Sequence, residues 1–169
     1  GWIVVVPTFQ LTQIKNNHQF WNRKYEAPNT EGFIFRLKPW VIDKYIDYKK
    51  RKVEILDYGC GEGASSYHFL KSYSYIPHGV DISVPSIKAC KLKFKKYKNN
   101  FKVISPEPSE NDNFFNKKFD LIIAVENLYY LDDEDCEKRL ISLKKMLKPN
   151  GFVFFSTMRL FWSARDLED

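Results

Sequence analysis

The chain has 169 residues, of which 44% are hydrophobic and 28% charged, as in a single globular domain with one hydrophobic core. Its formal net charge is +6, and its three cysteines are too few and too widely spaced for a disulfide framework or a CxxC metal site. The opening apolar run is too short to span a membrane and has no basic start, so we expect a cytoplasmic protein that binds no membrane and no metal.

Residues 1–35 are expected to form an N-terminal extension, and residues 36–169 the main domain. The domain opens with a helix over 36–48 and then alternates strands with helices. Apolar runs predict strands over 53–57, 79–82, 101–104, 120–125 and 151–157. Helices are predicted over 64–72, 85–97 (capped by Ser83) and 133–147. Continuous apolar strands separated by helices are typical of a parallel sheet covered on both faces, so the predicted fold is α/β and doubly wound.

The predicted helix over 85–97 is the most basic part of the chain, with lysines concentrated between Lys88 and Lys98. Its apolar residues form a partial helical stripe, made of Ile87, Cys90, Leu92, Phe94 and Tyr97. This pattern favours a solvated amphipathic helix, with a nucleic-acid-binding patch as the alternative.

A glycine-rich turn, DYGCGEG, follows the first predicted strand. Glycines there permit positive φ and a close approach of the backbone to a ligand. The pattern alone is weak, because it also matches a dinucleotide-binding fingerprint and because a glycine turn can simply link a strand to a helix. Asp81 ends the second predicted strand, at the same sheet edge, where a carboxylate can accept hydrogen bonds from a ribose diol. A capping or surface aspartate is the alternative interpretation.

Four segments together resemble the class I S-adenosylmethionine-dependent methyltransferases that act on small molecules. VEILDYGCGEG resembles their first motif, GVDIS their second-strand motif, FDLIIAVENLYYL their fourth-strand motif and LKPNGFVFFST the segment that leads into their fifth strand. The segments occur in the family's order. The resemblance implies a Rossmann-like sheet of order 3-2-1-4-5, with S-adenosylmethionine as cofactor and S-adenosylhomocysteine as product.

The resemblance also assigns cofactor contacts. Asp57 would hold the ammonium group of the cofactor, and Asp81 its ribose hydroxyls. The turn residues would wrap the methionine part, and they are Gly59, Cys60, Gly61 and Gly63. The remaining contacts would come from Ile82 against the adenine, Pro106 and Glu107 at the adenine edge, and Val125 and Glu126 beside the methionine part. FWNRKYEAP resembles a segment that precedes the core in many small-molecule members, so Trp21 and Tyr25 are expected to close over the cofactor.

The sequence does not single out one general base. The candidates are Glu126, Tyr130 and His18, while His78 is placed before the second strand, at the edge opposite the site. A small-molecule or saccharide acceptor, methylated on oxygen or nitrogen, is favoured. An RNA or protein methyltransferase and a non-catalytic nucleotide-binding domain are the alternatives. The fourth-strand segment lacks the prolines of amino-methylating DNA enzymes, and no Pro-Cys pair suits cytosine-C5 chemistry, so nucleic acid is not the expected partner.

Family members usually continue past the fifth strand with a helix and an antiparallel strand pair. Only twelve residues follow Thr157, so a sheet lacking those C-terminal strands is expected, as in a fragment that retains the cofactor half. Its fifth strand would be an open edge. Either the WIVVV run at residues 2–6 adds to that edge as a further strand, or two chains pair there as a homodimer.

Overall fold

The computed structural model describes residues 2–5, 52–125 and 127–156. The N-terminal extension, apart from its first strand, and the helix predicted over 36–48 lie outside the described residues. The strands are β1 (Trp2–Val5), β2 (Glu54–Tyr58), β3 (Ile76–Asp81), β4 (Phe101–Val103), β5 (Phe119–Ala124) and β6 (Leu147–Ser156). The helices are α3 (Ala64–Tyr73), α4 (Val84–Lys93) and α5 (Asp133–Lys145), with 3-10 turns η1 (Lys95–Asn100) and η2 (Leu128–Tyr130).

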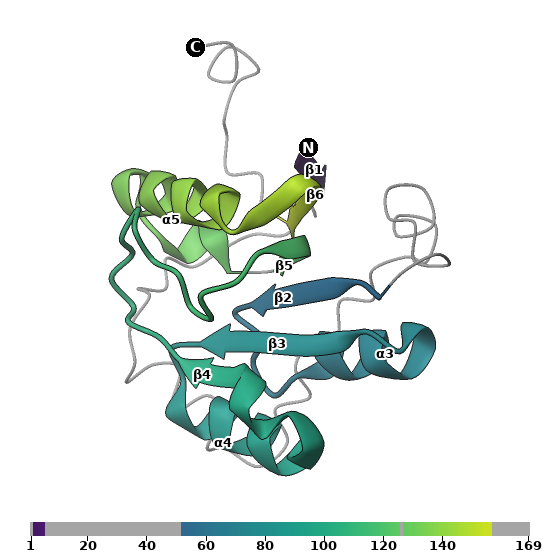
Figure 1. Cartoon of the computed structure of the whole chain (residues 1–169). Helices are drawn as coiled ribbons and strands as arrows, with labels where there is room; N and C mark the ends of the chain where they lie inside the picture. The colour runs from purple at the N-terminus through teal and green to yellow at the C-terminus, as the bar shows by residue number, and fades with distance from the viewer. Residues whose placement is uncertain (1, 6–51, 126, 157–169) are drawn as a thin grey trace.

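All the strands join one parallel sheet in the order β1-β6-β5-β2-β3-β4. Five of them, from β4 through β3, β2 and β5 to β6, stand in the predicted order 3-2-1-4-5, which confirms the α/β doubly wound fold. The sixth, β1, pairs in parallel with β6 and places Trp2 opposite Val153 (Figure 1). The N-terminal run is therefore a strand at the β6 edge, one of the two arrangements that the sequence offered.

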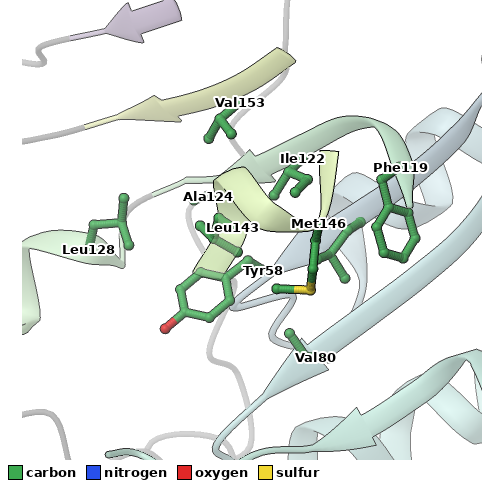
Figure 2. Packing of buried hydrophobic residues seen from close by; sticks show 10 residues of the cluster. Tyr58, Val80, Phe119, Ile122, Ala124, Leu128, Leu143, Met146 and Val153 are labelled. Carbon is green, nitrogen blue, oxygen red and sulfur yellow. The ribbon is translucent and has the colours of Figure 1, made fainter. Parts of the chain in front are cut away.

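Alternate residues of the strands pack into two cores on opposite faces of the sheet. Ile55 packs with Phe69 of α3 on one face, whereas Leu56 packs with Leu143 of α5 on the other. Figure 2 shows the second core, in which Leu143 and Met146 lie among buried strand residues such as Ile122. This alternation is the period of two expected for strands covered on both faces.

Two predicted strand starts were wrong. The sequence placed the start of the second strand at Gly79, but β3 begins at Ile76 and contains Pro77 and His78. Proline fits there because β4 pairs with β3 only from Gly79 onward, so Pro77 has a strand neighbour on one side alone. The start predicted at Gly151 is likewise too late, because β6 begins at Leu147 and bulges between the positions opposite Phe119 and Leu121.

The basic helix ends earlier than predicted, at Lys93 rather than residue 97. Phe94 leaves the helical conformation and stacks on Phe101 of β4, with ring centroids 4.9 Å apart. Leu92, a member of the predicted apolar stripe, is 72% exposed, whereas Cys90 of the same stripe is fully buried. Ser83 caps the helix as predicted, accepting a hydrogen bond from the backbone of Ser86.

Candidate functional site

The glycine loop, residues 59–63, leaves the carboxyl end of β2 and turns toward β3. Its three glycines all have positive φ, at 68°, 51° and 77° for Gly59, Gly61 and Gly63. The amides of Gly59 and Cys60 both donate to the carbonyl of Val80, at 2.8 and 3.0 Å. The loop is therefore fixed against the end of the neighbouring strand, with its backbone in the left-handed conformation that glycine adopts without strain.

Asp81 ends β3 beside this loop and is 8% exposed. One carboxylate oxygen accepts the amide of Gly61 at 2.8 Å, and the other accepts the amide of Ser83 at 2.8 Å. Each oxygen of a carboxylate can accept more than one hydrogen bond. Asp81 thus orients the loop and the start of α4 while presenting the kind of group that recognises a diol.

Asp57 lies one strand away, near the end of β2, and its side chain faces α3. Its carboxylate accepts a hydrogen bond from the Ser66 hydroxyl at 2.7 Å. Burial raises the pKa of Asp57 to about 6, against the lowering effect of Ser66 and with a further rise from the charge of Asp81. None of the ion pairs in the described part of the chain includes Asp57. A buried carboxylate without a cation at this edge fits the ammonium group of a ligand.

The remaining predicted contacts follow the carboxyl ends of other strands. Ile82, after β3, is almost fully buried, and Val125, after β5, is half-buried. The segment after β4 stays beside β3, because the amide of Ile104 donates to the carbonyl of Asp81 at 3.0 Å. In this segment Pro106 is half-buried and Glu107 is exposed.

Tyr130, a predicted catalytic candidate, is half-buried in η2, just beyond β5. Four other predicted site residues lie outside the described residues, namely His18, Trp21, Tyr25 and Glu126. Their roles stay predictions.

The Cys60 thiol is directed into the protein. It belongs to a buried cluster under the glycine loop, and a Cβ on Gly79 of β3 would lie 2.9 Å from its sulfur. A contact between Cys60 and a ligand would therefore come from its backbone.

His78 was wrongly placed before the strand. It is buried inside β3, with its ring edge-on to Phe115 and Phe119 at 5.1 and 5.4 Å.

Sequence reasoning missed three residues that hold the site together. Asn127, after β5, donates its amide to the carbonyls of Tyr58 at 2.5 Å and Val125 at 3.1 Å, which ties the ends of β5 and β2. Ser66 orients Asp57, and the thiol of Cys90 donates to the carbonyl of Gly61 at 3.2 Å. No sequence signal marks these contacts, since each depends on which elements the topology brings together.

Within the described ranges, no helix is both long and apolar enough to cross a membrane. The same residues contain no cluster of three or more histidine, cysteine or acidic side chains suited to a metal ion.

Comparison with known proteins identifies relatives that are similar to this chain in sequence and in fold. The chain is 32% identical over 114 residues to a ubiquinone biosynthesis O-methyltransferase of Pelagibacter ubique, covering 66% of this chain and 45% of the relative. It is 26% identical over 151 residues to the protein of the same name from Rickettsia akari, covering 85% and 57%. The chain thus spans about half the length of these curated relatives. The solved structure of PKMT2 from Rickettsia typhi in complex with AdoHcy is similar with a TM-score of 0.52 and 30% identity, over 62% of this chain and 20% of that one.

A family described as a methyltransferase domain matches residues 55–151, which include the glycine loop, Asp57 and Asp81. This match covers more than half of the chain and the whole run from β2 into β6. Together with the AdoHcy-bound neighbour, it supports the predicted cofactor pair, S-adenosylmethionine and S-adenosylhomocysteine. The chain therefore belongs to the S-adenosylmethionine-dependent methyltransferases of class I.

Proposed function

We propose that the protein transfers the methyl group of S-adenosylmethionine to a hydroxyl oxygen of a small molecule. The observation that carries this proposal is the pair of buried carboxylates, Asp57 and Asp81, on adjacent strand ends flanking a loop of three positive-φ glycines. The names of the curated relatives, both O-methyltransferases, favour oxygen over nitrogen as the acceptor atom. Because a quinone is the oxidised form of a dihydroxybenzene, a phenolic hydroxyl is the acceptor we propose ahead of a saccharide.

The residues of the chain would act by binding and orientation. Asp57 would hold an ammonium group, Asp81 a pair of ribose hydroxyls, and the glycine loop would approach the ligand with its backbone. The bound cofactor supplies a methyl group already activated on a sulfonium. The protein must then align the acceptor oxygen with that methyl group, exclude water and accept the hydroxyl proton. Tyr130, Glu126 and His18 remain the candidates for the last role.

Binding tests the cofactor site directly. S-adenosylhomocysteine at 100 times its dissociation constant should stabilise the chain by about 2.7 kcal/mol, whereas NAD and NADP should leave its melting temperature unchanged.

Asp81→Ala should weaken S-adenosylhomocysteine binding by about 1–3 kcal/mol, the range for hydrogen bonds to a charged group, measured by titration calorimetry. Glu137→Ala is the matched control, since it removes an exposed carboxylate on α5. Equal affinity in the Asp81 and Glu137 variants would remove Asp81 from the site. If the parent protein does not bind S-adenosylhomocysteine, the proposed function is refuted.

Transfer of a labelled methyl group identifies the acceptor class. We expect label on phenols and catechols, and none on saccharides, RNA or a mixed protein sample. Transfer to RNA or protein would instead support the macromolecular alternative. Cofactor binding without transfer to any acceptor would contradict the proposed activity while leaving the cofactor site intact.

A further inference from the structure

The peptide units around Gly61, in the middle of the glycine loop, are held from two directions. Its amide donates to Asp81 at 2.8 Å. Its carbonyl accepts the thiol of Cys90 at 3.2 Å and, more distantly, the thiol of Cys60 at 3.6 Å. Both sulfurs are buried, so they do not exchange these contacts for water. Buried side chains therefore fix both the donor and the acceptor of this loop residue.

Cys90 reaches the loop from α4, 29 residues along the chain. The start of the same helix is fixed by Asp81, whose second oxygen accepts the amide of Ser83, the α4 cap. The loop and α4 are thus joined at two points. Asp81 links Gly61 to Ser83 at the start of α4, and Cys90 links α4 back to Gly61. The carboxylate and the thiol therefore fix the same peptide segment relative to one helix.

We propose that Cys90 is a positioning residue for cofactor binding, whose thiol hydrogen bond holds Gly61 in the conformation that receives the ligand. The inference rests on the proposed function, because it assigns Cys90 its effect through the loop that would bind S-adenosylmethionine. Gly61 has a φ of 51°, and a glycine samples many other conformations when unconstrained. A contact that fixes the Gly61 backbone before the ligand binds reduces the conformational entropy that is lost on binding, and this favours affinity.

The surroundings of Cys60, the second thiol at this loop, disfavour redox chemistry. The neighbouring thiol of Cys90, burial, and the charges of Asp57 and Asp81 together hold the pKa of Cys60 well above its ordinary value. Thiol oxidation proceeds through the thiolate, and the raised pKa disfavours the thiolate of Cys60. The protonated S–H form is the one that can donate to the Gly61 carbonyl.

Packing limits which side chains can replace Cys90. A Cβ on Gly63 would already lie 3.1 Å from the Cys90 sulfur and closer still to the Phe94 ring. Larger residues would therefore displace the loop by steric overlap. Serine and alanine both fit, and only serine keeps a donor, so this pair separates the hydrogen bond from the volume.

The test compares Cys90→Ser, Cys90→Ala and, as control, Cys136→Ala, which removes a half-buried thiol from α5. Titration calorimetry with S-adenosylhomocysteine should show a two- to tenfold loss of affinity for Cys90→Ala, about the range for one hydrogen bond. Cys90→Ser should stay within about twofold of the parent, on the same argument, and Cys136→Ala should match it. Melting temperatures without ligand confirm that each variant is folded.

A second measurement uses the parent alone and is independent of variant stability. S-adenosylhomocysteine should slow the labelling of Cys90 by a thiol reagent, because the bound ligand holds the loop over it, and should leave the labelling of Cys136 unchanged. Parent-like affinity in Cys90→Ala, an equal loss in Cys90→Ser, or unaltered Cys90 labelling would each overturn the positioning role while the parent still binds the ligand. A parent that fails to bind overturns the proposed function together with this inference.

Discussion

Asp57 carries the clearest conflict between stability and function at the scale of single residues. Its folded pKa of about 6 lies above its unfolded value of 3.8, so the native state takes up a proton that the unfolded chain lacks between about pH 6 and pH 4. This group therefore adds stability as the pH falls through that window, and it costs stability above pH 6, where it is charged and buried.

Asp57→Asn should relieve that cost and retain an oxygen for the Ser66 hydroxyl. We expect the variant to be more stable than the parent at pH 7.5, by at most about 3 kcal/mol, with the difference vanishing below about pH 4. Denaturant unfolding at several pH values measures it. A variant less stable than the parent at pH 7.5 would show that the folded protein stabilises the charged form of Asp57 and that burial is not the dominant effect on this carboxylate.

Ligand binding should respond to the same ionisation in the opposite sense. An ammonium group pairs with the charged carboxylate, so the affinity for S-adenosylhomocysteine should fall as the pH drops through about 6. Asp57→Asn should bind more weakly at neutral pH and show a flatter pH profile between pH 5 and 8, where its own side chain does not titrate. Parallel profiles for parent and variant would assign the pH dependence to another group.

At the scale of elements, the junction of β2, the glycine loop and β5 depends on two residues that fit each other. Gly59 has a φ of 68°, and a Cβ there would overlap the carboxamide of Asn127, which bridges the two strands. Gly59→Ala should therefore reduce S-adenosylhomocysteine affinity at least about tenfold, through overlap and backbone strain together. Adding Asn127→Ala removes the overlap alone and should recover only part of the loss, while Glu62→Ala in the same loop should bind as the parent does. Parent-like binding by the single Gly59 variant would contradict this account.

The sequence predicts elements well where their signal is local. The five core strands are mostly apolar runs, and the glycine turn and Asp81 mark the ends of two of them, so the sheet and the position of Asp81 follow from the pattern. The role of Asp57 came only from the resemblance to the methyltransferase family. The early end of α4 was missed because Phe94 leaves the helix to stack on Phe101, a partner that only the fold supplies. The bridge made by Asn127 and the thiol contact of Cys90 were missed for the same reason, since both link segments far apart in sequence.

On the scale of the whole molecule, charges gather at the amino edge of the sheet, opposite the candidate site. Glu54 pairs with Lys117 at 2.6 Å, and Lys148 bridges Glu54 and Asp120 at 3.4 and 3.0 Å. His78 lies near this group, and burial, followed by the charge of Lys117, lowers its pKa to about 4, with Glu54 opposing the shift. The histidine is thus neutral in the native state at neutral pH.

Acid should therefore destabilise the protein through His78. The folded pKa of about 4 lies below the unfolded value of 6.5, so the unfolded chain binds the extra proton and stability is lost as the pH falls from 6.5 toward 4. His78→Gln cannot titrate, and its stability should decline less than that of the parent between pH 7 and pH 5. This trend is opposite in sign to that of Asp57, which lets the two be separated in the same denaturation series. A parent and variant that decline equally would exclude His78 as the acid-sensitive group.

The β6 edge of the sheet bears on whether the chain associates with other molecules. β1 pairs with β6 along Trp2–Val5, so the backbone on that side of β6 has a strand partner within the chain from Val153 to Ser156. An uncovered strand of this composition would offer its edge to other molecules, including a second copy of the chain, as the predicted homodimer requires. The pairing of β1 is thus expected to favour a monomer over association through β6.

Replacing two neighbouring residues of β1 with proline tests this role. Consecutive amides of a strand point to opposite sides, so Ile3→Pro combined with Val4→Pro removes a donor facing β6 whichever of the two provides it. We expect a loss of about 1–3 kcal/mol, a melting temperature about 2–10 °C lower, and concentration-dependent association visible by light scattering. Ile3→Thr combined with Val4→Thr keeps both amides and a β-branched shape, and should remain close to the parent in both measurements. If the proline variant stays as stable and as monomeric as the threonine variant, β1 does not protect the edge of β6, and the sheet must tolerate that edge by other means.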